Sequence, residues 1–209
     1  MYTLSKNGVK MAECLYQGSF NPVHNAHLAV AEYVHKTFNI EKIVFIPAFK
    51  PPHKDLKDFN LQNAMHRLEM VQLAVEDIPY LDVSAIEYTR NKPSYTFDTI
   101  SQIYEIVQPQ EKINFIIGTD AFIQIETWYR TDELKKLVNF ILFVRENNFD
   151  EAPFEKLKKK GYNYTLMKMP FMDISASEIR LRCKEGKAID DLVPLKVAEY
   201  IRKNDLYKV

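Results

Sequence analysis

The stretch of this chain best suited to chemistry runs from Gly18 to His27 and reads GSFNPVHNAH. A short apolar run, Cys14 to Tyr16, precedes it, and a helix-like run continues from it to Phe38. Because His24 and His27 are three residues apart, they would share one face of the first helical turn. A helix N-terminus presents N–H groups and partial positive charge, which suit an anion. We therefore predict a phosphate-binding strand, turn and helix.

Two other interpretations of the histidine pair remain open. One histidine could cap or pack the helix start while the other is exposed, or the pair could bind a metal ion. A zinc site needs at least a third protein ligand, and His53 is the obvious candidate. Lys50 and Lys54 lie beside His53 and would repel a cation. This favours an anion site, and we predict no metal held by the protein.

A second helix start is predicted in Ile174 to Arg182, ISASEIRLR. Ser175 and Glu178 have the spacing of a capping box. The N–H groups of the first turn and the Ser177 hydroxyl could meet a phosphate, with Arg180 about one turn further on. An ordinary capped helix with surface arginines explains this motif alone equally well. Beside the histidine helix, however, it offers a second N-terminus to the same polyphosphate.

Three further segments carry polar or aromatic groups, namely KPPHK at 50–54, PSYTFDT at 93–99, and GTD at 118–120 with Trp128 eight residues later. A carboxylate that follows a parallel strand suits ribose hydroxyls, and an aromatic ring can stack on a base or a pyridine ring. Each segment also has an ordinary interpretation, as a solvated basic loop, as helix caps, or as a core tryptophan.

Alternating strand and helix patterns must position these motifs. We expect strands at 12–17, 42–47, 80–89, 112–117, 140–144 and 164–169, and helices at 25–38, 62–76, 95–107, 154–160, 176–184 and 194–204. The alternation predicts an α/β, Rossmann-like, doubly wound parallel sheet with helices on both faces. We expect one domain over 1–209, with 1–10 as a loose lead-in and 174–209 as a small C-terminal helical part. Ligands of such sheets bind beyond the C-terminal ends of the strands, where the motifs fall.

Composition excludes several classes of protein. Lys and Arg together number 28, as do Asp and Glu, so the formal net charge of the 209 residues is zero. This argues against nucleic-acid and membrane-surface partners, because proteins that bind them normally carry an excess of Lys and Arg. Cys14 and Cys183 form no CxxC pair, and the chain shows neither a signal peptide nor an apolar run long enough to span a membrane. We therefore expect a soluble, cytoplasmic protein, whose oligomeric state the sequence does not give.

The common nucleotide fingerprints are missing. The five glycines cannot make a GxGxxG, a P-loop or a GxSxG elbow. If this protein handles nucleotides, it must hold their phosphates by other means, and the histidine stretch is the main candidate.

The motifs together resemble the bacterial nicotinate-nucleotide adenylyltransferase family, within the HxGH nucleotidyltransferase superfamily. The resemblance rests on GSFNPVHNAH at 18–27, PPHK at 51–54, Arg67 with Met70, PSYTFDT at 93–99, GTD at 118–120 with Trp128, and ISASEIR at 174–180. There are three departures. Gln17 stands where the family often has a second glycine, Ala26 fills the usual glycine of HxGH, and Ala176 replaces a frequent Ser or Thr.

This resemblance implies adenylyl transfer from ATP to nicotinate mononucleotide, giving deamido-NAD and pyrophosphate in NAD biosynthesis. The mononucleotide phosphate would attack the ATP α-phosphorus without a covalent enzyme intermediate, and Mg²⁺ would be bound mainly through the ATP phosphates. The implied catalytic residues are His24, His27 and Arg180. The implied ATP-binding residues are Gly18, Ser19, Phe20, His24, His27, Gly118, Asp120, Ile174, Ser175, Ser177 and Arg180. The implied acceptor-binding residues are Asn21, Lys54, Ser94, Tyr95, Thr96 and Trp128.

Three alternatives stay open at this point. One is a superfamily nucleotidyltransferase with another acceptor, such as phosphopantetheine, although the PSYTFDT segment favours a pyridine nucleotide. Another is a nucleotide sensor without turnover, against which the intact His24, His27 and Arg180 argue. The third is a zinc hydrolase, which lacks a convincing third ligand. The preference between the nicotinate and nicotinamide mononucleotides does not follow from the sequence, because backbone N–H donors leave no mark in it.

Overall fold

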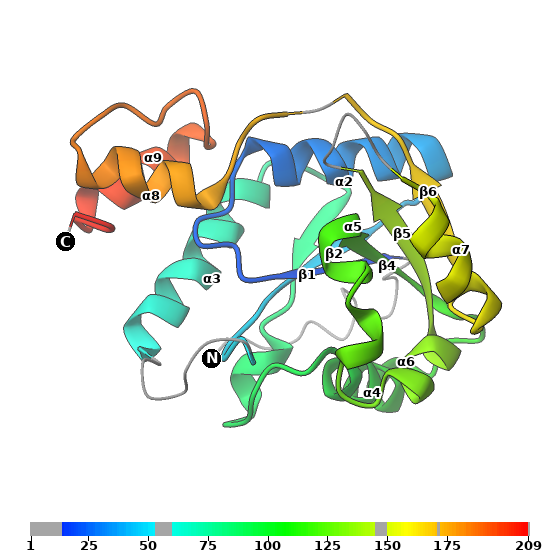
Figure 1. Ribbon diagram of the computed structural model, residues 1–209. Helices are drawn as coiled ribbons and strands as arrows, with labels where there is room; N and C mark the ends of the chain where they lie inside the picture. Colours follow the sequence, from blue (N-terminus) through cyan, green and yellow to red (C-terminus); the bar gives the residue numbers. More distant parts are fainter. Residues whose placement is uncertain (1–13, 53–59, 145–149, 171, 209) are drawn as a thin grey trace.

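A single parallel sheet organises the chain (Figure 1). The computed structural model describes residues 14–52, 60–144, 150–170 and 172–208. Within them six strands form one sheet in the order β3-β2-β1-β4-β5-β6, and every neighbouring pair is parallel. The strands are β1 (Cys14–Gly18), β2 (Ile43–Pro47), β3 (Leu81–Val83), β4 (Ile113–Gly118), β5 (Val138–Phe143) and β6 (Tyr164–Met167).

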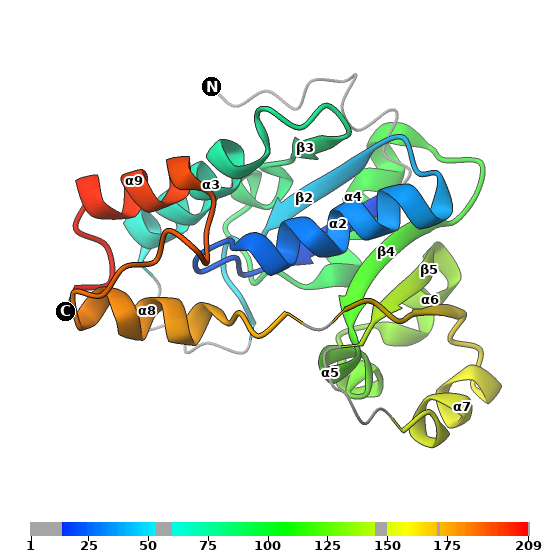
Figure 2. The ribbon, with the colours of Figure 1, turned by 90° about the horizontal axis from the view of Figure 1, so that it is seen from above.

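Helices cover both faces of this sheet (Figures 1 and 2). One face carries α2 (Asn25–Phe38), α3 (Leu61–Val75), α8 (Ala176–Lys184) and α9 (Leu195–Lys203). The other carries α4 (Thr96–Val107), α6 (Thr131–Leu137) and α7 (Ala152–Lys159). Short segments, η2 (Ile86–Thr89), α5 (Thr119–Phe122) and η3 (Ile125–Thr127), connect them. The predicted α/β, doubly wound architecture is confirmed.

Strand β1 shows how the sequence builds two cores from one sheet. Successive side chains of a strand point to opposite faces. Cys14 and Tyr16 are buried in the core under α2 and α3, whereas Leu15 is buried in the core under α4 and α6. A strand buried on both sides is uniformly apolar, which is why β1, β2 and β4 were recognisable in the sequence.

The C-terminal helices pack on the first core. Ile179 of α8 and Val197 and Ile201 of α9 are buried there. Helix α9 lies beside α3, where Nδ1 of His66 is 2.8 Å from the hydroxyl oxygen of Tyr200 (Figure 2). The C-terminal helices are therefore held against α3 and the core that lies under α2 and α3.

The predicted strand at 80–89 is wrong beyond its first residues. Strand β3 ends at Val83, and the chain turns into the 3₁₀ segment η2. Ser84 Oγ accepts from the backbone N–H of Ile86 at 3.3 Å, which turns the backbone away from the sheet. Ile86 and Glu87 are both buried within this 3₁₀ segment.

Helix α6 was not predicted. It begins after Arg130, whose φ of 52° lies in the left-handed region, and only Leu134 of the helix is buried. A seven-residue, mostly polar helix carries too little apolar periodicity to show in the sequence. The predicted helices at 25–38 and 176–184, by contrast, coincide with α2 and α8. The predicted lead-in at 1–10 lies outside the described residues. None of the helices that the structure describes is both long and apolar enough to cross a bilayer.

The order of the strands fixes where a ligand can bind. From β1 the chain moves outward through β2 to β3 and then returns to the other side of β1 with β4. In such a sheet the crossovers leave a crevice beyond the C-terminal ends of the two central strands. Those ends are Gly18 in β1 and Gly118 in β4.

Candidate active site

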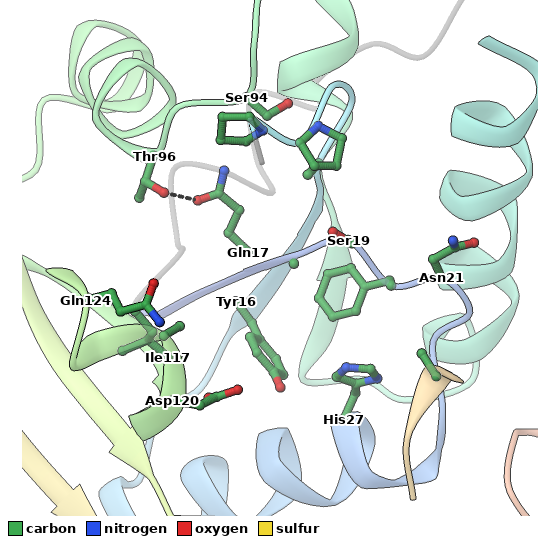
Figure 3. Close-up of a pocket in the computed structure, with 18 of the residues that line it drawn as sticks. Tyr16, Gln17, Ser19, Asn21, His27, Ser94, Thr96, Ile117, Asp120 and Gln124 are labelled. Atoms are coloured by element: carbon green, nitrogen blue, oxygen red, sulfur yellow. Dashed lines mark hydrogen bonds between the residues drawn. The ribbon is translucent and has the colours of Figure 1, made fainter. Parts of the chain in front are cut away.

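A cavity of about 840 Å³ lies at this switch point (Figure 3). Every predicted site residue that the structure describes lines it, and they are Gly18, Ser19, Phe20, Asn21, His24, His27, Ser94, Tyr95, Thr96, Gly118, Asp120, Trp128, Ile174, Ser175, Ser177 and Arg180. Lys54, the remaining predicted residue, lies outside the described residues, as does His53. The fold thus brings together motifs from both ends of the chain.

The turn after β1 depends on a glycine for space. Phe20 has a φ of 45°, a left-handed conformation that bulky residues seldom adopt, and its ring folds back over Gly18. A Cβ at position 18 would lie 3.0 Å from that ring. The ring also meets His27 edge-on, with 5.0 Å between the ring centres. Gly18 therefore lets Phe20 support His27 from the side.

The two histidines adopt different roles at the start of α2. His24 is the buried N-cap residue, and its backbone N–H donates to Nδ1 of His27 at 3.2 Å. The two imidazole rings are tilted by 32° to each other, with 3.7 Å between their centres. A neutral imidazole that accepts at Nδ1 carries its proton on Nε2. His27 is thereby fixed as an Nε2–H donor at the cavity wall.

The backbone at the start of α2 is partly closed by the C-terminal part. The N–H of Asn25 donates to the carbonyl oxygen of Leu192 at 2.9 Å, and the Asn25 side-chain amide donates to Asp191 O at 3.1 Å. The first N–H of the helix is therefore already engaged. An anion at this helix would meet the histidine side chains rather than the backbone of Asn25.

Helix α8 supplies the second predicted helix start. Ser175 Oγ accepts from the backbone N–H of Glu178 at 3.1 Å, as predicted for the cap. The reciprocal half of the predicted capping box is wrong, because the Glu178 carboxylate instead accepts from Arg182 at 3.0 Å. Cap stabilisation therefore comes from the serine alone.

Arg180 joins the two helix starts. Its Nη1 donates to the carbonyl oxygen of Asn21 at 2.7 Å, and its Nη2 donates to Ser177 Oγ at 3.1 Å. These two bonds hold the planar guanidinium at the cavity, between the loop after β1 and the first turn of α8. The interpretation of Arg180 as a freely solvated surface arginine does not describe this geometry.

Strand β4 delivers a carboxylate to the cavity. Asp120 lies in α5, directly after the strand, and its carboxylate folds back toward Gly118. A Cβ at position 118 would come within 2.3 Å of Asp120 Oδ1. Glycine is thus required here for close approach, not for an unusual backbone angle. Figure 3 shows Asp120 on the same side of the cavity as Tyr16 and His27.

Aromatic side chains form the other end of the cavity. Trp128 is half-buried after η3, and Tyr95 lies at the N-cap of α4. The ring of Tyr129, which sequence reasoning missed, packs on Tyr95 with 4.7 Å between centres. Ser94 is fixed by two bonds to Lys50, since Ser94 Oγ accepts from Lys50 N at 2.9 Å and Ser94 N donates to Lys50 O at 2.8 Å.

Arg67 is a buried arginine for which the sequence predicted no role, and it holds two loops next to the cavity in place. Arg67 is 5% exposed and donates to the carbonyl oxygens of Ser19, Ala48 and Phe49 at 2.8, 2.6 and 3.1 Å. Desolvation by burial lowers the pKa of its guanidinium from the usual value. The three bonds tie the loops that follow β1 and β2 to helix α3.

The polar walls suit an anionic ligand at the histidine end. His27 and Arg180 are donors there, and Asp120 is a carboxylate that lines the same cavity. Over the described residues, no three His, Cys, Asp or Glu side chains lie close enough together to hold a metal ion.

Fold and cavity together are those of the Rossmann-like nucleotide-binding proteins. The model of the cytidylyltransferase-like family matches residues 15–182. A probable nicotinate-nucleotide adenylyltransferase of Caldicellulosiruptor bescii is 39% identical over 95% of this chain and 100% of its own. One of Staphylococcus haemolyticus is 36% identical over 95% and 98%. The chain therefore belongs to the cytidylyltransferase-like family and, within it, to the nicotinate-nucleotide adenylyltransferases, a group of nucleotidyltransferase enzymes.

Solved structures agree with this assignment. The nicotinic acid mononucleotide adenylyltransferase of Plasmodium falciparum complexed with NaAD superimposes with a TM-score of 0.75 and 25% identity, covering 93% of this chain and 96% of that one. The same protein complexed with APC gives a TM-score of 0.72 at 23% identity over the same shares, a likeness of fold.

Proposed function

We propose that this protein transfers the adenylyl group of ATP to nicotinate mononucleotide, forming deamido-NAD and pyrophosphate in NAD biosynthesis. The relatives that match almost the full length carry this activity in their names. One observation of the structure carries the proposal furthest. The first residues of α2 and α8 are 151 residues apart in sequence, yet the two helix starts meet at one cavity and are joined by the bond from Arg180 to Asn21.

The histidine end would bind the ATP phosphates. His27 offers Nε2–H to phosphate oxygens, because its Nδ1 is occupied by the backbone of His24. Arg180 uses two of its N–H groups within the protein and has others to offer to the departing pyrophosphate. Ser175, Ser177 and Ile174 line the wall beside it. Asp120 and Gly118, at the end of β4, would contact a ribose.

The aromatic end would bind the pyridine ring of the acceptor. Trp128 and Tyr95 offer ring faces, and Ser94 and Thr96 border the same part of the cavity. Backbone N–H groups at the start of α4 suit a carboxylate. Asn21 lines the same cavity and would contact the reacting phosphate.

The proposed reaction is one direct displacement. An oxygen of the mononucleotide phosphate bonds to the α-phosphorus of ATP, the bond to the α–β bridging oxygen breaks, and that electron pair leaves with pyrophosphate. Catalysis then consists of positioning and of donors aimed at the charge that develops on the phosphates. His24, His27 and Arg180 supply those donors without forming a covalent bond.

Magnesium fits this site as a companion of ATP. His27 and Arg180 donate hydrogen bonds at the phosphate end rather than offering oxygen ligands, and Mg²⁺ prefers phosphate, carboxylate and water oxygens. Bound mainly through ATP phosphates, the ion would offset part of their negative charge.

The test is product formation. The purified protein is incubated with ATP, Mg²⁺ and nicotinate mononucleotide, and we expect release of pyrophosphate and deamido-NAD in equal amounts. A folded protein that releases none would disprove the proposal. A parallel panel with nicotinamide mononucleotide and phosphopantetheine decides between acceptors, since the true acceptor has the highest kcat/KM. Tight ATP binding without product from any acceptor would point to a sensor.

A further inference from the structure

Gln17, near the end of β1, extends along the cavity wall toward α4. Its side chain extends from the strand toward Thr96, on the side of the cavity that Ser94 also borders (Figure 3). The amide oxygen of Gln17 accepts from the Thr96 hydroxyl at 2.7 Å. This position was noted in the sequence only as a departure from a frequent glycine. A glycine there would have neither the reach nor the bond.

The amide nitrogen of Gln17 is also held by a hydrogen bond. Its Nε2 donates to Oε1 of Glu87 at 2.5 Å. Because one amide end accepts and the other donates, the two bonds fix the orientation of the group. Gln17 thus forms a bridge from Glu87 to Thr96, and the bridge passes along the wall of the cavity.

Glu87 anchors this bridge inside the protein. It is 1% exposed, and its carboxylate accepts from Thr99 Oγ1 at 2.6 Å and from the backbone N–H of Phe49 at 3.0 Å. The guanidinium of Arg90 lies 3.8 Å from the same carboxylate. A buried charge is stable only when it is surrounded by such donors. The network therefore joins β1, the loop after β2, η2 and the first turns of α4 into one unit.

We propose that Gln17 is a positioning residue for the mononucleotide acceptor, an inference that rests on the proposed function. Through Thr96 it holds the N-terminal turn of α4 and the adjoining 94–96 segment against the end of β1. Its partner Thr96 lines the acceptor side of the cavity, whereas His27 and Arg180 line the ATP side. Loss of the bridge should therefore weaken acceptor binding selectively.

Gln17→Met tests the bridge, because methionine keeps nearly the same volume but neither hydrogen bond. We expect the KM for nicotinate mononucleotide to rise about five- to tenfold, the worth of one or two net hydrogen bonds. The KM for ATP should change less than about twofold. Gln17→Gly, the frequent family residue, should raise the acceptor KM at least as much. Gln72→Met, a half-buried glutamine of α3 outside the cavity, is the matched control and should leave both KM values unchanged.

The pattern of constants separates positioning from folding. A purely structural role would lower the melting temperature and the active fraction, and hence kcat, while leaving both KM values alone. That result, or equal rises in both KM values, would overturn the inference. If the wild type forms deamido-NAD and Gln17→Met keeps the wild-type acceptor KM, the inference alone fails. If the wild type forms no product, the proposed function fails, and this inference with it.

Discussion

The hydroxyl of Tyr207 donates to Oδ1 of Asn21 at 2.7 Å, across 186 residues of sequence. Burial raises the pKa of Tyr207, so the hydroxyl stays protonated and able to donate throughout the physiological range. With Oδ1 occupied, the Asn21 amide offers its N–H₂ end as a donor. The end of the chain thus sets the orientation of a side chain at the cavity.

Tyr207→Phe removes that one hydroxyl. We expect kcat/KM to fall about three- to tenfold, the worth of one net hydrogen bond, because the Asn21 amide is then free to rotate. Tyr200→Phe is a matched control. Tyr200 also lies in the C-terminal part, but its hydroxyl is bonded to His66 of α3, away from the cavity. Equal losses in the two variants would contradict the role given to Tyr207.

His27→Ala should lower kcat by about two orders of magnitude or more, the usual cost of removing one donor to a developing charge. The physical reason is the loss of the Nε2–H that His24 fixes in place. His35→Ala, further along α2, is the control, because its ring stacks on Tyr80 outside the cavity. A near-normal kcat for His27→Ala under saturating substrates would exclude the role.

Arg180→Lys keeps the positive charge but removes the planar guanidinium with its several N–H donors. A lysine cannot contact Asn21 O, Ser177 Oγ and a phosphate at once, so we expect kcat/KM for ATP to fall about tenfold or more. Steady-state kinetics with pyrophosphate as product inhibitor checks this, since inhibition should weaken in parallel. Arg182→Lys, whose partners are Glu178 and Asp191, should behave as wild type; if it loses as much activity, the effect belongs to the helix and not to the site.

Trp128→Ala should raise the KM for nicotinate mononucleotide about tenfold or more, because stacking of a ring on an aromatic side chain is worth about 1–3 kcal/mol. Trp128→Phe keeps a ring face and should recover most of the loss. The KM for ATP serves as the internal reference. If it rises as far as the acceptor KM, the tryptophan is part of the general packing and not of the acceptor site.

Sequence reasoning worked where a local signal determines the structure. Helix α8 begins at Ser175 because a serine side chain caps it, and a cap is visible in the sequence. The predicted site residues that the structure describes line one cavity because they sit at strand ends and helix starts, which a parallel sheet gathers at one edge.

Sequence reasoning failed where residues far apart in the sequence determine the structure. Arg67 is buried because carbonyl groups of two loops surround it, and those loops meet only in the fold. Glu87 points inward because Phe49 and Thr99 donate to it, so a segment that looks like a strand becomes η2. The hydrogen-bond partners of Arg67 and of Glu87 leave no pattern in the sequence close to either residue.

The hydrogen bonds between the C-terminal part and the start of α2 with the loop before it have a consequence for the order in which the protein folds. Arg180 donates to Asn21, and Leu192 accepts from Asn25, so the loop after β1 is secured by residues that follow the last strand of the sheet in sequence. Such long-range contacts form late in folding. The six strands can therefore pair while the cavity is still open, and the cavity is completed only when α8 and the segment after it have packed on the start of α2.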